Sequence, residues 1–236
     1  LARTPLEERR LIRYADVAAG VSLDEALLDH AEQLELFACS WTGTGHLPLD
    51  ALADRGVAVT NASGVHAPGL AAQAMGFMLI FARNLHRGWH HQRARRWEHF
   101  RAGELDDTTV TIVGQGSIGS AIVDRLAGFD VHTIGVRHSP EKGGATDEVV
   151  GYENSDVHDA LSRSDYVVLA CPLTETTRGL IDREALLTLP PSAVVVNVSR
   201  GQVVDTDALL WALRERSIRG AALDVTDPEP LPPDHP

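Results

Sequence analysis

The feature that most constrains the fold is a strand, Thr109–Val113 (TVTIV), that runs directly into a G-x-G-x-x-G motif. The segment Ile118–Ala127, which follows the turn, indicates a helix. A strand, a turn with three glycines at this spacing and a helix are together typical of a Rossmann-type dinucleotide-binding domain. An ordinary glycine-rich turn between a strand and a helix is the alternative.

Each glycine of the motif has its own expected task. Gly114 allows the tight turn, Gly116 lets a pyrophosphate approach the backbone, and Gly119 lets the helix pack close to the strand. The phosphates would then face free N–H groups at the positive end of the helix dipole. We therefore predict that this turn binds a dinucleotide.

The residues after the next expected strand, Val131–Val136, indicate which dinucleotide binds. Arg137 lies 18 residues after Gly119, where an NAD site usually carries an acidic residue about 20 residues after the motif. A cation suits a 2′-phosphate, and Ser139 and Lys142 add hydrogen-bond donors. We predict NADP(H), with NAD as a second possibility, and an exposed arginine that binds nothing is the alternative.

Strands and short helices alternate through the rest of this region. The further strands are expected at Tyr166–Ala170, Ala193–Val198 and Ala221–Val225, and the further helices at Val157–Leu161, Arg183–Leu187 and Thr206–Glu215. This alternation with short links predicts a doubly wound α/β domain of about 130 residues.

The first part of the chain shows the same rhythm on a smaller scale. Helices are expected at Leu6–Tyr14, Leu23–His30 and Pro48–Arg55, and strands at Leu34–Ser40 and Val57–Asn61. This order implies a parallel sheet. A long helix from Ala67 to about Trp97, broken near Gly88, follows.

We therefore predict an α/β protein with two Rossmann-like, doubly wound parallel-sheet domains. The boundary is expected near Gly64, where a strand gives way to the long helix. Residues 1–64 would form part of a substrate domain that lacks its first strand, and residues 65–236 would form the dinucleotide-binding domain with the connecting helix.

Charge narrows the choice of partners. The chain holds 33 acidic and 21 basic residues, a net charge of −12, which disfavours binding to nucleic acid or to an anionic membrane. No apolar run approaches the roughly 18–20 residues of a membrane span.

Only Lys142 among the basic residues is a lysine. An acidic, lysine-poor surface indicates a halophilic protein, and a GC-rich genome, which favours arginine codons, is the alternative.

The two cysteines, Cys39 and Cys171, each end an apolar stretch and have no neighbouring metal ligands. We predict free, buried thiols in a reducing cytoplasm. His86 and His90 lie four residues apart on an expected helix, but no third ligand stands in a recognisable pattern. We therefore predict no metal site.

Three further strings complete a family pattern: Ala170–Ile181 (ACPLTETTRGLI), Val195–Asp205 (VVNVSRGQVVD) and Gly220–Pro232 (GAALDVTDPEPLP). Together with the glycine motif, they make the chain resemble the D-isomer-specific 2-hydroxyacid dehydrogenase family over about residues 40–236. The resemblance implies an oxidoreductase that moves a hydride between NADP(H) and C2 of a small 2-oxo acid. It also implies a cleft between two domains that closes to exclude water.

The resemblance gives two residues catalytic roles. Arg200 would bind the substrate carboxylate and polarise the 2-oxo group, because a guanidinium fork can hold two oxygens and stabilise a developing alkoxide. Glu229 would pair with the catalytic histidine and raise its pKa. That histidine is expected beyond Pro236, and His235 is not nominated. A surface ion pair for Arg200 and a solvated loop acid for Glu229 are the alternatives.

The resemblance also implies the binding residues. Asp224 would bond the nicotinamide carboxamide, with a helix N-cap as the alternative. The backbone N–H groups of Thr42, Gly43 and Thr44 would hold the substrate carboxylate together with Arg200. The residues expected around the cofactor are Gly114, Gly116, Ser117, Ile118, Gly119, Arg137, His138, Ser139, Cys171, Pro172, Thr177, Val198, Ser199 and Asp224.

Assembly is expected to involve residues 83–101, which hold six of the 20 arginines together with Trp89 and Trp97. The family places this region near the subunit contact, so we predict a homodimer; the negative net charge argues against a nucleic-acid patch.

Ala72 stands where the family commonly has Glu, which leaves the interdomain packing open. A nucleotide-sensing, corepressor-like binding protein on the same fold is the alternative from a different functional class.

Overall fold

The computed structural model describes residues 2–236, which divide into two compact units. One unit ends at His66 and the other begins at Ala67, close to Gly64, where the sequence changes from a strand to a long helix. None of the helices in residues 2–236 is long and apolar enough to cross a bilayer.

The first unit is a three-stranded sheet with a small apolar core around Phe37 and Leu52. Its strands β1 (Val17–Gly20), β2 (Leu36–Cys39) and β3 (Ala58–Thr60) are parallel and lie in this order, and its helices are α1 (Pro5–Ile12), α2 (Glu25–Leu28) and α3 (Leu49–Asp54). The expected parallel sheet is confirmed. The sequence does not predict β1, because VAAG is too short to show a period and ends in glycine.

The second unit is built on a six-stranded sheet in which all neighbouring strands are parallel. The strand order is β6 (Glu148–Val150), β5 (His132–Val136), β4 (Thr109–Val113), β7 (Tyr166–Leu169), β8 (Val194–Asn197) and β9 (Gly220–Leu223). This order confirms the predicted doubly wound, Rossmann-type sheet.

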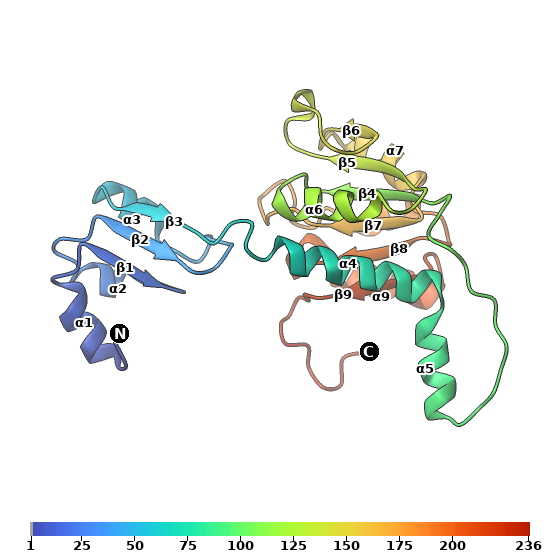
Figure 1. The fold of residues 1–236 in the computed structure, drawn as a ribbon, viewed down its shortest axis with the longest axis horizontal. Coiled ribbons are helices and arrows are strands. Elements are labelled where there is room, and N and C mark those ends of the chain that lie inside the picture. Colours follow the sequence, from blue (N-terminus) through green and yellow to red (C-terminus); the bar gives the residue numbers. More distant parts are fainter. Residues whose placement is uncertain (1) are drawn as a thin grey trace. The chain divides into compact units, whose positions relative to one another are not determined.

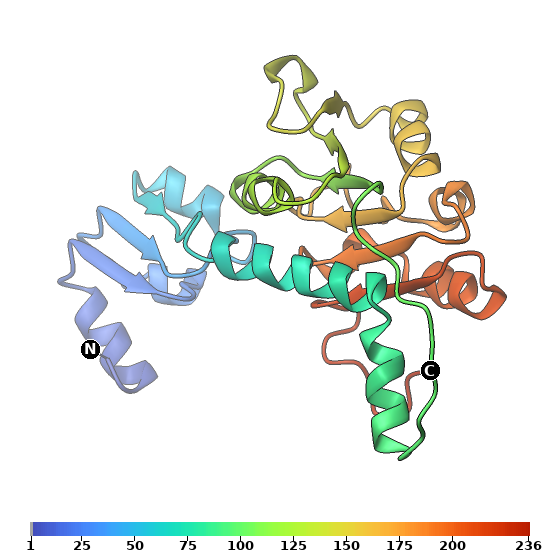
Figure 2. The same cartoon turned by 45° about the vertical axis from the view of Figure 1, so that its right-hand side comes forward.

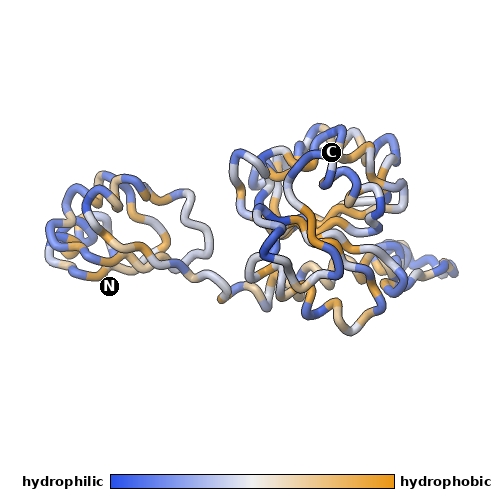
Figure 3. The backbone as a smooth tube through the Cα atoms, turned by 90° about the horizontal axis from the view of Figure 1, so that it is seen from above, coloured by the Kyte–Doolittle hydropathy of each residue, from blue (hydrophilic) through white to orange (hydrophobic). Residues whose placement is uncertain are grey.

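Helices cover both faces of this sheet (Figures 1 and 2). One face packs against α4 (Ala67–Ala82) and α6 (Ser117–Leu126), and the other against α7 (Asn154–Ser162), α8 (Arg183–Thr188) and α9 (Thr206–Glu215). Val194 and Val196 of β8 face α4 and α6, whereas Val195 faces the other layer. Figure 3 shows the hydrophobic segments running through this sheet. Burial on both faces explains why these strands read as continuous apolar runs.

The central strand β4 positions the candidate site. It pairs with β5 on one side and with β7 on the other, so the winding of the chain reverses at β4. In a doubly wound sheet, ligands bind beyond the carboxyl ends of the strands at this reversal. The glycine motif follows the carboxyl end of β4 directly.

The break in the long helix lies at Asn84 rather than at Gly88, so that prediction is wrong. Asn84 adopts a left-handed conformation (φ 54°), and its side-chain amide donates to the Arg101 carbonyl at 2.8 Å. Gly88 lies inside the following helix, α5 (Leu85–Arg93), where an added Cβ would only touch Phe100 at 3.7 Å. Asparagine tolerates the left-handed region through its short polar side chain, and a contact 17 residues away holds it there.

Strand β6 also lies outside the sequence-based prediction. It is three residues long and is anchored by groups distant in sequence. Arg163 donates two hydrogen bonds to the carboxylate of Glu148, at 2.8 and 3.0 Å, and this lowers the pKa of Glu148. The backbone N–H of Thr133 donates to Asp147 at 2.8 Å. Tertiary contacts, rather than local pattern, make this segment the edge of the sheet.

Candidate functional site

The turn between β4 and α6 shows why each motif glycine is needed. Gly114 has φ +101°, and an added Cβ there would lie 2.7 Å from the Cys171 backbone. An added Cβ at Gly119 would lie 1.9 Å from the Gly114 carbonyl oxygen. At Gly116, by contrast, no heavy atom of the described chain, apart from Gly116 and its two chain neighbours, lies within 4 Å of an added Cβ. Two glycines therefore serve the packing, and the third faces open space.

This turn fits the phosphates of a dinucleotide. Gly116 is the N-cap residue of α6 and supplies no side-chain cap, and Gly116 and Ser117 are exposed. The N–H groups of the first helical turn therefore receive no capping oxygen from a side chain at the N-cap position. Backbone N–H groups and the helix dipole at such an end attract an anion. The cradle that a Cβ at Gly116 would fill is the observation that supports a bound pyrophosphate.

Arg137 follows β5 and lies half-buried beside the loop that leads to β6. Its guanidinium donates to the Gly143 carbonyl, and its backbone N–H donates to the Val150 carbonyl at 3.0 Å. Arg137 takes part in no ion pair within residues 2–236, so no carboxylate neutralises it there. His138 is exposed and Ser139 half-buried. The loop thus presents two positive charges, Arg137 and the exposed Lys142, and neighbouring donors.

Gln115, inside the glycine motif, was not predicted to matter. Its side-chain amide lies against the backbones of Gly135 and Gly144, where an added Cβ would approach it to 2.7 and 2.8 Å. Both polar atoms of the amide are buried and find no hydrogen-bond partner in the described chain. Glycines at positions 135 and 144 are therefore what make room for this side chain, which joins the glycine turn to the loop after β5.

Cys171 and Pro172 follow β7 next to the glycine turn. Cys171 is free and buried, and burial raises the pKa of its thiol to about 11. A protonated thiol is a poor nucleophile, so Cys171 acts as a small apolar side chain in the core of this unit. The hydroxyl of Thr177, which is 2% exposed, donates to the Pro172 carbonyl at 2.6 Å. The Thr177 side chain therefore shapes this loop, and its contact with a cofactor stays a prediction.

Arg200 lies after β8, at the same edge of the sheet as the glycine turn. Val198 and Ser199 before it are buried, whereas Arg200 is exposed and donates from Nη1 to the Ser199 carbonyl at 2.7 Å. Among the ion pairs of residues 2–236, none includes Arg200. The alternative assignment of Arg200 to a surface ion pair therefore finds no support.

Asp224 and Glu229 follow β9, the neighbour of β8. Asp224 is exposed, and its backbone N–H donates to the Asn197 carbonyl at 2.9 Å. No helix begins after Asp224 in the part of the chain that the structure describes, so Asp224 is not a helix N-cap. Glu229 is exposed between two prolines. An added Cβ at Gly201 would lie 2.0 Å from the Thr226 carbonyl oxygen, which shows how closely this segment packs against the Arg200 turn.

Asn61 is a residue that the sequence analysis missed in the first unit. It follows β3, and its side-chain amide donates to the Thr42 carbonyl at 2.6 Å, which braces the loop Thr42–Thr44. A hollow of about 490 Å³ beside this loop is lined by Thr44, Leu49, Val59, Thr60 and Asn61. The strand before Asn61 is three residues long and mostly exposed, so no signal in the sequence would have identified Asn61.

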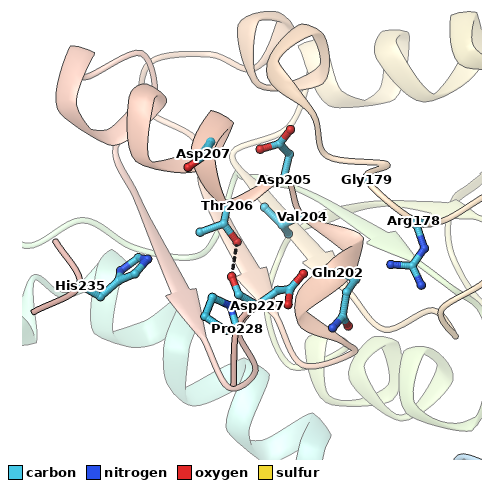
Figure 4. A pocket seen from close by; sticks show the side chains of 10 residues that line it. All are labelled: Arg178, Gly179, Gln202, Val204, Asp205, Thr206, Asp207, Asp227, Pro228 and His235. Carbon is cyan, nitrogen blue, oxygen red and sulfur yellow. Dashed lines mark hydrogen bonds between the residues drawn. The ribbon is translucent and has the colours of Figure 1, made fainter. Parts of the chain in front are cut away.

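A second hollow, of about 480 Å³, lies at the start of α9 (Figure 4). Asp205, Asp207 and Asp227 line it together with Arg178 and His235, and the Thr206 hydroxyl donates to the Asp227 carbonyl at 2.7 Å. None of the residues predicted to bind cofactor or substrate lines this hollow. The glycine turn, Arg200 and Asp224 are instead grouped at the carboxyl ends of β4, β8 and β9.

Comparison with known proteins identifies relatives over most of the chain. Residues 75–236 match the family model of the D-isomer specific 2-hydroxyacid dehydrogenase, NAD binding domain. The chain is 33% identical to a glyoxylate reductase of Pyrococcus furiosus, with 94% of this chain and 70% of that protein covered. It is 32% identical to a D-3-phosphoglycerate dehydrogenase of Methanocaldococcus jannaschii, with 95% and 44% covered.

Solved structures show the same likeness. The TT0316 protein from Thermus thermophilus is 31% identical, with a TM-score of 0.82 over 100% of this chain and 76% of that one. An NAD-dependent formate dehydrogenase from Staphylococcus aureus in complex with NAD is 28% identical, with a TM-score of 0.78 over 100% of this chain and 72% of that one. The chain therefore spans between about half and three quarters of the length of these relatives.

Proposed function

Because the chain belongs to the D-isomer specific 2-hydroxyacid dehydrogenase family, we propose that it transfers a hydride between NADP(H) and a small 2-oxo or D-2-hydroxy acid. The observation that carries this proposal is the grouping of the glycine turn, Arg200 and Asp224 at one edge of a single sheet. The turn is suited to phosphates, Arg200 to a carboxylate and Asp224 to an amide.

The residues of the second unit would divide the work as follows. Gly116 and the first turn of α6 hold the pyrophosphate, and Asp224 accepts a hydrogen bond from the nicotinamide carboxamide. The bound nicotinamide supplies or accepts the hydride. Arg200 holds the carboxylate and the 2-oxo oxygen of the substrate and stabilises the negative charge that develops on that oxygen during reduction.

Two further tasks remain, the donation of a proton to the substrate and the binding of the substrate carboxylate by the first unit. Glu229 would hold a protonated imidazole, because a carboxylate next to imidazole raises its pKa. In the first unit, the backbone N–H groups of Thr42, Gly43 and Thr44 would bind the substrate carboxylate. Asn61 supports this role because it fixes the loop through the Thr42 carbonyl.

The activity test follows the oxidation of NADPH and NADH by the intact protein with straight-chain, branched and aromatic 2-oxo acids. The assay is run at low and at molar KCl, because we propose a salt-adapted protein on the basis of its net charge of −12 and single lysine. Turnover of a 2-oxo acid supports the proposal and names the substrate class. Tight NADPH binding without turnover of any acid would favour a nucleotide-sensing binding protein.

Arg137 leads us to propose a preference for NADP(H). Replacing Arg137 by glutamine is expected to weaken NADPH binding by about 10- to 100-fold, since a hydrogen bond to a charged group contributes about 1.5–3 kcal/mol. The Kd of NADH should change by less than about threefold, because NADH lacks the 2′-phosphate. Titration of both dinucleotides by calorimetry measures this difference.

Arg214→Gln is the matched control, since Arg214 is an exposed arginine on α9, on the other face of the sheet from α6. It removes the same charge and should leave both Kd values unchanged. Equal weakening of NADPH and NADH binding in Arg137→Gln would contradict the proposed preference.

Exposed tryptophans support a homodimer. Trp89 on α5 and Trp97 in the segment after it are 60% and 90% exposed, and α5 projects away from the sheet of its own unit (Figures 1 and 2). Large exposed aromatic groups of this kind mark contact surfaces. We expect light scattering to give twice the chain mass, and the double variant Trp89→Ser/Trp97→Ser to give the single-chain mass.

Leu187→Ser on α8 is the control for the dimer, since Leu187 is an exposed apolar side chain elsewhere on the same unit. It should leave the mass unchanged. A wild-type protein with the mass of one chain would exclude this dimer.

The two cysteines, which are free and buried, support a reducing cytoplasm as the location of the protein.

A further inference from the structure

Strand β8 ends in a polar residue that the family resemblance leaves without a role. Three buried valines, Val194–Val196, precede Asn197, and Asn197 itself is 1% exposed. A buried amide costs free energy unless its donors and acceptors find partners. The partners of Asn197 therefore indicate why this side chain is tolerated at the end of the strand.

Both ends of the Asn197 amide bind the turn that carries Arg200. The Asn197 Oδ1 atom accepts hydrogen bonds from the Ser199 backbone N–H at 3.0 Å and from the Ser199 hydroxyl at 2.8 Å. The Asn197 Nδ2 atom donates to the Arg200 carbonyl at 2.9 Å. The side chain thus closes the turn on both sides of the Ser199–Arg200 peptide bond.

The backbone of Asn197 also forms a hydrogen bond with the segment that follows the neighbouring strand β9. Its carbonyl accepts the Asp224 N–H at 2.9 Å, so the same residue sets the start of the segment that carries Asp224. The two segments are in close contact at Gly201, because an added Cβ there would lie 2.0 Å from the Thr226 carbonyl oxygen. A movement of the Arg200 turn would therefore also disturb the segment that carries Asp224.

This inference rests on the proposed function. We propose that Asn197 is a positioning residue for hydride transfer, because it orients Arg200 toward the 2-oxo acid. Aspartate is the informative replacement. It keeps the shape of asparagine and the acceptor for Ser199, but a carboxylate oxygen replaces the donor and faces the Arg200 carbonyl. Two acceptors repel each other, so the turn should open and move Arg200, while the backbone bond to Asp224 remains.

The kinetic test compares Asn197→Asp with the wild type in the intact protein. We expect kcat/KM for the preferred 2-oxo acid to fall by about 100-fold, because a displacement of about 1 Å can cost this much. The NADPH Kd should stay within about threefold. In the Arg200→Ala background the same replacement should change kcat/KM by less than about threefold, because the residue that it positions is absent.

Thr111→Val provides a matched control for the loss of a buried hydrogen bond. Thr111 is fully buried in β4, and its hydroxyl contacts the hydroxyl of Ser164, in the turn between α7 and β7, at 2.6 Å. Thr111→Val should change kcat/KM by less than about twofold even if it lowers the melting temperature. If Asn197→Asp fails to fold, Asn197→Thr, which is neutral and smaller, takes its place with the same expected split.

Hydrogen exchange separates the failure of this proposal from the failure of the proposed function. In Asn197→Asp the amide of Val203, which donates to the Arg200 carbonyl at 3.2 Å, should exchange at least about tenfold faster, while the amide of Asp224 keeps its protection. This holds whether or not the wild type turns over any 2-oxo acid. Unchanged exchange at Val203, or an equal loss of kcat/KM in both backgrounds, would overturn the positioning role.

Discussion

Replacing Gly119 by alanine is expected to abolish dinucleotide binding and to destabilise the second unit by about 3 kcal/mol or more. The added Cβ would lie 1.9 Å from the Gly114 carbonyl oxygen and 3.0 Å from its carbon, both of them backbone atoms that cannot rotate away. Helix α6 would have to move off β4, and the turn that faces the phosphates would move with it. Thermal unfolding should show a Tm lower by roughly 6–12 °C.

Gly116→Ala is the matched comparison within the same motif. Apart from Gly116 and its two chain neighbours, no heavy atom of residues 2–236 lies within 4 Å of a Cβ added there, so the Tm should stay within about 2 °C of the wild type. The space is instead where the pyrophosphate is proposed to lie, so the Kd for NADPH should rise by about tenfold or more. Unchanged NADPH binding in Gly116→Ala would contradict the proposed place of the phosphates.

Replacing Arg200 by alanine is expected to lower kcat/KM for the 2-oxo acid by about 10³-fold or more. Loss of a single preorganised donor to a developing oxyanion costs about 10²–10³ in rate, and loss of the charged partner of the carboxylate weakens substrate binding as well. Arg200 is exposed and donates to the Ser199 carbonyl. The Tm and the NADPH Kd should therefore change little. Steady-state kinetics with NADPH held saturating separates kcat from KM.

Arg200→Lys tests whether the planar fork or only the charge is needed. Lysine keeps the positive charge but offers a single ammonium, so it cannot hold a carboxylate and a 2-oxo oxygen in one plane. We expect an activity between that of the wild type and that of Arg200→Ala. Wild-type kinetics in Arg200→Ala would remove Arg200 from the mechanism and leave the proposed reaction without its substrate anchor.

The local sequence pattern was sufficient to predict the positions of those helices and strands whose own residues indicate their secondary structure. The strand–glycine–helix unit at Thr109–Val113 and Ser117–Leu126 appears within one or two residues of its expected place. The same holds for the buried strands β7 and β8, since burial on both faces makes them continuous apolar runs. Pattern failed for β1 and β6, which are too short to show a period and exist because neighbouring strands pair with them.

By itself, the sequence determined the type of sheet, the place of the glycine turn and which residues suited to anions follow its strands. These depend on spacing along a few consecutive residues, where the period of a strand, the freedom of glycine and the chemistry of a guanidinium are already defined. The sequence also contained Asn197 and Gln115, but one asparagine or glutamine among many carries no signal until its partners are known.

Only the tertiary structure decided how these parts are held together. The contact of Gly114 with Cys171, of Gly201 with Thr226 and of Asn197 with Asp224 each joins residues more than 20 positions apart. Such contacts depend on which strands become neighbours, and burial by those neighbours is what turns a polar side chain into a positioning group. The order of the strands in space, which no local pattern contains, therefore groups the residues proposed to bind anions at one edge of the sheet.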